Sequence, residues 1–152
     1  MRRVLVLLAA LAVLLGTTGA PADARTNTAE VRYAQQAFTA TNANRAHHGL
    51  RPLKPHDCVQ HAAVRQAKRM AQQERMFHQD LYAVLRDCGL NTAGENVAYG
   101  FRTGRSVVND GWMHSAGHRA NILNREYRLM AVGARKGDDG LWYAAQVFGR
   151  KF

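Results

Sequence analysis

The spacing of apolar residues changes from a helical to a strand-like period towards the C-terminus, and this change constrains the fold most. Residues Leu129–Ala134 and Leu141–Phe148 have the apolar, extended pattern of β-strands. The turn cluster Gly137–Gly140 lies between them and predicts a β-hairpin. Earlier segments carry apolar residues at helical spacing instead. Helices followed by a terminal hairpin predict an α+β domain built in layers.

Three longer segments of the chain have helical character. Residues Glu30–His48 are rich in helix formers, and Gly49 is placed to end that helix. A second helix, capped by Asp57, carries one narrow apolar stripe, and a third covers Ser106–His114 with Ser106 as its cap. We expect a break at Ala116–Gly117, a helical turn at Leu81–Cys88 and a strand at Asn91–Tyr99.

The first 24 residues have the three-part plan of a secretory signal. A basic start at Arg2 and Arg3 precedes the apolar run Val4–Leu15, and small residues follow. We expect cleavage after Ala24, with Ala20 as the second choice, and therefore a secreted, extracellular protein. The apolar run is shorter than a membrane span and no later segment resembles one, so we expect no transmembrane anchor in the mature chain.

The mature chain of about 128 residues is long enough for one domain and too short for two. We expect a short lead over residues 25–34, a single domain over residues 35–152, and a monomer. The full sequence has a net charge of +10, and removal of the signal with its two arginines and one aspartate leaves +9, which favours anionic partners. The Lys and Arg residues are scattered and form no compact basic run with interleaved aromatics, so no nucleic-acid partner is expected.

Cys58 and Cys88 are the two cysteines of the chain. An even pair in an exported domain predicts a disulfide, which would close a loop of about 30 residues. A metal site built from Cys and His is the competing interpretation, but neither cysteine belongs to a C-x-x-C pair. We therefore expect the disulfide.

Two glycine-rich motifs place titratable side chains where the backbone must be tight. The first, Gly94–Gly100, surrounds the carboxylate of Glu95. The second, Gly111–Leu123, contains the imidazole of His118. Polar, titratable groups among residues suited to tight backbone geometry are typical of a functional site.

Four other residues have a structural interpretation. The side-chain amides of Asn96 and Asn121 are expected to tie loops together. Trp112 is expected in the core, because large aromatic side chains dominate core packing. Arg45 is expected to make a structural contact at the end of the first helix.

Four segments of the chain recur in the same order in one known family. They are Asn42–Leu53, the helix ending at Met70 with Phe77-His78 beyond it, Gly94–Ala98 and Trp112–Leu123, and the terminal strand Tyr143–Gly149 fits as well. On these motifs the chain resembles the CAP superfamily (cysteine-rich secretory proteins, antigen 5 and plant pathogenesis-related proteins), specifically its compact secreted bacterial branch. The resemblance implies an α–β–α sandwich with a small antiparallel sheet between helical layers.

The resemblance also implies a shallow cleft lined by two histidines and two glutamates. The first histidine corresponds to His78, the first glutamate to Glu95 and the second histidine to His118. Ser115 stands where animal and plant members have the second glutamate, so the cleft holds at most three of the four residues. The resemblance therefore does not extend to an activity that needs both carboxylates.

Three chemistries remain open for the cleft residues. His78 and His118 could hold a divalent ion such as zinc, as the histidines of some family members do, and we expect reversible binding rather than a permanent cofactor. A hydrolytic site would use Glu95 as general base with a histidine partner, but a nucleophilic Ser115 would lack an orienting acid. Glu95 could equally form an internal ion pair that fixes the loops.

We favour a secreted binding module without enzymatic activity, whose extracellular ligand is a lipid or a cell-wall component. Its cleft would be formed by His78, Glu95, Ser115 and His118. The first alternative is a metal-assisted hydrolase or peptidase that uses the two histidines and the glutamate. The second alternative is an inert structural module.

Overall fold

The computed structural model describes residues 22–152, with side chains from residue 29 onward. The predicted signal segment lies outside this part, apart from its last three residues. Within the described range no helix is long and apolar enough to cross a membrane. The elements are α1 (Ala22–His47), α2 (Asp57–Gln72), α3 (Leu81–Cys88), β1 (Thr92–Tyr99), α4 (Gly104–Ser106), η1 (Val107–Gly111), η2 (Trp112–His114), α5 (Ala116–Leu123), β2 (Leu129–Lys136) and β3 (Trp142–Arg150).

Three antiparallel strands form one sheet in the order β1-β3-β2. The predicted hairpin is confirmed, because β2 pairs with β3 in a register that places Met130 opposite Phe148. β1 pairs with the other edge of β3, where Gly94 lies opposite the same phenylalanine. The strand formed last in the sequence is therefore the central strand of the sheet.

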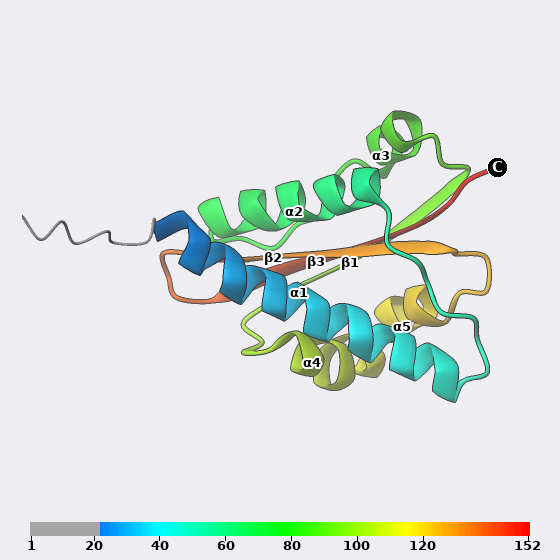
Figure 1. The fold of residues 1–152 in the computed structure, drawn as a ribbon, viewed down its shortest axis with the longest axis horizontal. Coiled ribbons are helices and arrows are strands. Elements are labelled where there is room, and N and C mark those ends of the chain that lie inside the picture. The colour runs from blue at the N-terminus through cyan, green and yellow to red at the C-terminus, as the bar shows by residue number, and fades with distance from the viewer. Residues whose placement is uncertain (1–21) are drawn as a thin grey trace, which may run out of the picture.

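Helices cover both faces of this sheet (Figure 1). α2 and α3 lie on one side, and α1, α4 and α5 lie on the other. Consecutive residues of β3 divide between the two sides: Val147 packs in a cluster with α2 and α3, whereas Phe148 packs in a cluster with Trp112 and residues of α1 and α5. The expected α–β–α sandwich of the α+β class is confirmed.

α2 packs very closely on the sheet. Its inward residues include the fully buried alanines Ala63 and Ala67. Opposite them on β2, a Cβ atom at Gly133 would lie 2.3 Å from the carbonyl oxygen of Ala63, so only glycine fits this contact. Small residues on both elements thus bring the helix and the strand together.

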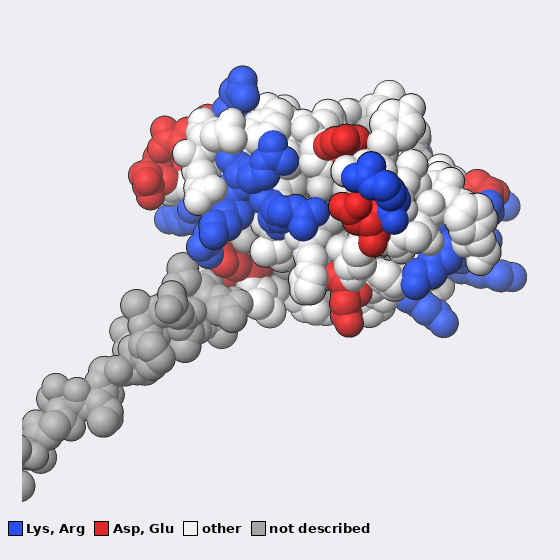
Figure 2. Space-filling view, turned by 90° about the horizontal axis from the view of Figure 1, so that it is seen from above, with Lys and Arg blue, Asp and Glu red and all other residues white. Residues whose placement is uncertain are grey.

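The outward face of α2 is basic. Its exposed residues include Arg65, Lys68 and Arg69. Figure 2 shows Lys and Arg side chains gathered over this layer, with acidic side chains lying between some of them. Arg65 and Lys68 form no ion pair within the described residues, which agrees with a solvated charged face.

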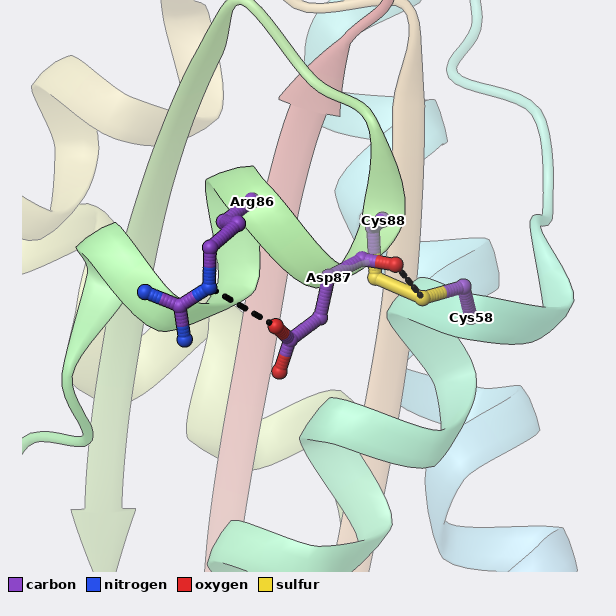
Figure 3. Close-up of a disulfide and its surroundings, with 4 residues drawn as sticks. All are labelled: Cys58, Arg86, Asp87 and Cys88. Carbon is purple, nitrogen blue, oxygen red and sulfur yellow. Dashed lines mark hydrogen bonds and ion pairs between the residues drawn. A yellow bond between two sulfur atoms is a disulfide. The ribbon is translucent and has the colours of Figure 1, made fainter.

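The disulfide between Cys58 and Cys88 is confirmed (Figure 3). Its S–S distance is 1.97 Å and the two Cα atoms are 5.6 Å apart. It joins the first turn of α2 to the last residue of α3. The segment between these two helices, which carries His78, therefore lies inside a covalently closed loop.

The first helix is longer than predicted. α1 already begins at Ala22, so residues 25–34, predicted as a short lead, are helical, and cleavage after Ala24 would fall in its first turn. Contacts with the sheet hold the part of α1 that was predicted to be helical: Tyr33 is buried in the core, and Glu30 forms an ion pair with Arg135 of β2 at 2.6 Å. The small and polar residues before Glu30 form no apolar stripe, so no periodic pattern marks this first part of α1.

The sequence predicted Asp57 as the cap of α2, but Asp57 is the first residue of that helix. His56 occupies the capping position, and its side chain makes no capping hydrogen bond. The carboxylate of Asp57 still lies in the first turn, where it interacts favourably with the positive end of the helix dipole.

The predicted third helix, Ser106–His114, is a succession of short turns. Thr103 rather than Ser106 is the cap, and each of these two side chains accepts a hydrogen bond from the other residue's backbone N–H. The backbone then widens into the π-helical turn η1 and tightens into the 3₁₀ turn η2. Ser115 is extended, so the break comes directly before α5 rather than at Ala116–Gly117.

Candidate functional site

Glu95 is a buried carboxylate near the start of β1. Its side chain is 0% exposed, and both of its oxygens accept hydrogen bonds. Oε2 lies 2.7 Å from Nδ1 of His78 and 3.2 Å from the backbone nitrogen of Gln79, which donates to it. Oε1 accepts from the side-chain amide of Gln79 at 2.6 Å. The carboxylate thus binds the α2–α3 segment to the sheet.

The α2–α3 segment presents His78 through contacts on either side of it. Before it, the amide of Gln66 donates to the carbonyl oxygen of Phe77 at 2.5 Å. After it, the carboxylate of Asp80 caps α3 by accepting from two backbone N–H groups. The imidazole itself is 58% exposed. Since Nδ1 faces Glu95, Nε2 is the ring nitrogen available to a ligand.

His118 is placed on α5 by a network of side-chain amides. Asn96 donates to the carbonyl oxygen of His118 and to the side chain of Gln146, both at 3.1 Å. Asn121 donates to the carbonyl oxygen of Glu95 at 3.1 Å and to Asn96 at 2.9 Å. The expectation that these two asparagines tie segments together is confirmed, and the network fixes α5 against β1 and β3.

The electrostatic surroundings of His118 favour its neutral form. Burial lowers the pKa of His118 below its usual value, and the charge of His78 lowers it further. The neutral imidazole therefore predominates at neutral pH.

A small cavity of about 280 Å³ adjoins these residues. Its lining includes Ser115 and His118, together with Trp112 and Met76, but not His78 or Glu95. The four predicted cleft residues therefore divide into a hydrogen-bonded His–Glu pair and a serine and histidine that share the cavity. The Ser115 hydroxyl makes no hydrogen bond to a histidine or carboxylate in the described part of the chain, so nothing activates it as a nucleophile.

A larger groove of about 920 Å³ runs between α1 and the α4–η2 segment. Ala40, Ala43 and Met113 contribute apolar surface to it. Arg32 and Arg105 contribute positive charge. The sequence did not predict this groove, because its residues come from distant segments and mix apolar with polar types.

Sequence reasoning also missed the glutamines of the site. Gln79 supplies two of the bonds to Glu95, and Gln66 anchors the neighbouring carbonyl. Gln146 joins Asn96 to the hydroxyl of Thr41 on α1, to which it donates at 2.8 Å. The one available signal was a glutamine within the apolar run of β3, because a buried polar side chain needs partners.

Comparison with known protein families shows which family has this architecture. The family model of the cysteine-rich secretory protein family, CAP, matches residues 38–148, which is most of the chain. The chain belongs to the CAP family. Its fold and the order of its motifs agree with the resemblance that the sequence indicated.

Three bacterial proteins illustrate the similarity. The uncharacterized protein YkwD of Bacillus subtilis is 32% identical over 124 residues, which are 77% of this chain and 46% of YkwD. The structure of an extracellular protein containing an SCP domain from Bacillus anthracis is 28% identical with a TM-score of 0.74, covering 88% of this chain and 45% of that one. The structure of a cysteine-rich secretory protein from Staphylococcus aureus is 25% identical with a TM-score of 0.68, and the match covers 80% of this chain and 39% of that one. This CAP chain spans less than half of each.

His78 and His118 are the candidate ligands for a divalent ion in this CAP domain. His78 offers Nε2, and its Nδ1 partner Glu95 would orient the ring as an outer carboxylate does in metal sites. His118 is neutral at neutral pH, as a ligand must be. Among the described residues no group of three or more His, Cys, Asp or Glu side chains could hold a metal. Structural zinc takes four protein ligands, so the described residues do not form a structural zinc site.

The lowered pKa of His118 gives a direct prediction. In an NMR titration we expect its pKa below the usual 6.5, and we expect it to rise in His78→Gln while staying below 6.5, because burial is the larger cause. Since the folded pKa is below the unfolded one, His118 contributes stability above pH 6.5 that is lost as the pH falls through the folded pKa. A wild-type value at or above 6.5 would contradict the prediction.

Proposed function

We propose that this chain is the ligand-binding domain of a secreted protein, without enzymatic activity of its own, and that its ligand is an anionic lipid. The α1–α4 groove is the observation that carries the proposal. Its volume of about 920 Å³ lies in the range of small-molecule sites.

The shape and charge of the groove suit a fatty acid. Its lining on α1 extends from Val31 to His47, which at helical rise is about 24 Å and long enough for an extended acyl chain. Ala40, Ala43 and Met113 would contact the chain. Arg105 would meet the carboxylate, because it has no acidic partner within the described residues.

Two observations support an extracellular setting. The disulfide is of a kind that persists in oxidising compartments, and the N-terminal segment has the plan of a secretory signal. The Bacillus anthracis relative is described as extracellular and the Staphylococcus aureus relative as secretory. Cleavage after Ala24 remains part of this proposal.

The predicted cleft supports catalysis less well than binding. Both oxygens of Glu95 are engaged, which leaves the carboxylate poorly placed to activate water. The His78–Glu95 contact is the one observation in favour of the alternative, a metal-assisted hydrolase. In that case His78→Ala would abolish turnover of a peptide or ester substrate, whereas the binding proposal expects no turnover to lose.

The groove can be tested with a pair of matched substitutions on α1. We expect Ala43→Phe, which fills the groove, to weaken palmitate binding at least about tenfold in calorimetric titration. Ala46→Phe adds the same side chain at an exposed position of α1 outside the groove lining, and we expect it to leave affinity unchanged. Arg105→Gln should weaken palmitate but not hexadecanol, because only palmitate carries a charge.

Two results would overturn the proposal. One is a wild-type protein that shows no saturable binding of palmitate, which would favour the inert structural module. The other is an equal loss of affinity in Ala43→Phe and Ala46→Phe, which would mean that the ligand lies elsewhere. His78→Ala completes the set, and we expect it to bind palmitate like the wild type because the His78–Glu95 pair does not line the groove.

A further inference from the structure

Four arginines line one small cavity at the end of α1. Arg45 comes from the last turn of that helix, Arg51 from the following loop, and Arg125 and Arg128 from the segment between α5 and β2. The cavity has a volume of about 220 Å³. It shares no lining residue with the α1–α4 groove or with the cavity beside Ser115 and His118.

Arg45 is almost completely buried, with 1% of its surface exposed. Its guanidinium donates to three backbone carbonyls: Nε to Arg51 at 3.0 Å, and Nη1 to Ile122 and Asn124 at 2.7 and 2.8 Å. These bonds confirm its expected structural contact. The third nitrogen, Nη2, makes no hydrogen bond within the described residues, and Arg45 is one of the residues that line the cavity.

The positive charge of this cluster is not balanced by the described part of the chain. None of the four guanidinium groups has a carboxylate within ion-pair distance there, and the nearby Glu126 pairs with Arg150 instead. Burial lowers the pKa of Arg45 and the charge of Arg128 lowers it further, which shows that the like charges repel. Because a guanidinium stays protonated in proteins, an anion in the cavity would interact favourably with buried Arg45 and with the exposed Arg51, Arg125 and Arg128 together.

We propose that this arginine cavity binds a phosphate group. A guanidinium group can donate two parallel hydrogen bonds to two oxygens of one phosphate. A phosphate also carries enough charge and enough acceptors to bind several guanidinium groups at once. The cavity is smaller than the roughly 300–1,000 Å³ of sites that enclose a whole small molecule, so it takes the phosphate while the rest of the ligand stays outside. Free inorganic phosphate and the headgroup of an anionic phospholipid share this chemistry.

The test compares two charge-matched double variants in titrations with inorganic phosphate at constant ionic strength. Arg51→Gln/Arg125→Gln removes two cavity arginines whose side chains make no hydrogen bond in the described range and leaves Arg45 and its carbonyl contacts in place. We expect it to raise the dissociation constant for phosphate about tenfold or more. Arg65→Gln/Lys68→Gln lowers the charge of the exposed α2 face equally, and we expect less than about a twofold change.

A second arm distinguishes the two sources of phosphate. Vesicles of phosphatidylcholine, with and without phosphatidylglycerol, are sedimented with each variant. Binding to phosphatidylglycerol that is lost only in the cavity variant assigns the site to a headgroup, and phosphate binding without vesicle binding assigns it to a free anion. The proposal is overturned if wild-type protein binds neither probe, or if the two double variants lose affinity equally.

Discussion

Replacing Trp112 by alanine is expected to lower the free energy of unfolding by about 4 kcal/mol, the usual cost of removing a buried tryptophan. Trp112 is 1% exposed and packs in the cluster that joins α1, α5 and the sheet. Its indole nitrogen also donates to the carbonyl oxygen of Val97 at 3.2 Å. The substitution therefore leaves a cavity and an unsatisfied carbonyl together. Urea denaturation followed by circular dichroism measures the loss.

Trp112→Phe separates the two contributions. It keeps most of the apolar contact and removes the indole N–H, so we expect a loss of about 1–2 kcal/mol. Trp142, the only other tryptophan, then reports unfolding by fluorescence in both variants. Equal losses in the two variants would show that the hydrogen bond, and not the packing, accounts for the contribution of Trp112.

Removing the disulfide is expected to have the second largest effect. For a separation of 30 residues, the chain-entropy argument gives about 3.5 kcal/mol of stability, which Cys58→Ala/Cys88→Ala would lose. Alanine is chosen because Cys88 is buried and serine would place a hydroxyl there. Thermal unfolding monitored by circular dichroism measures the change.

Reduction supplies the control for the cysteine variant. A reducing agent should bring the wild type close to the melting temperature of the double variant and should leave the variant itself unchanged. A reduced wild type that melts like the oxidised protein would contradict the prediction, since the closed loop would then contribute nothing. The affinity of the α1–α4 groove should not change, because neither cysteine lines it.

The parts of the fold that the sequence predicts well are those with strong local signals. The hairpin follows from two strand-like runs around a turn cluster, and α2 from its apolar stripe. The π-helical and 3₁₀ turns before Ser115 could not be predicted in this way. Trp112, the first residue of the 3₁₀ turn, lies in the core and bonds to Val97, and local spacing does not record this tertiary contact.

In the site, too, local sequence signals predict some features and miss those that depend on tertiary contacts. The contact between His78 and Glu95 links positions 17 residues apart, and it was accessible only through the resemblance of the motifs to a family. The role of Gln79 was not accessible, since a glutamine in a polar segment has no distinguishing pattern. The arginine cavity was hidden for a similar reason: its residues stand up to 83 positions apart, between Arg45 and Arg128.

The central position of β3 determines when the sheet can form as the chain is synthesised. β1 and β2 each bond to β3 and not to one another, so neither has its partner until residues 142–150 have been made. Until then the inward faces of α1 and α2 remain uncovered, although both helices are complete. The domain is thus expected to fold in a single late step after its last strand leaves the ribosome, and to depend on protection from aggregation before that.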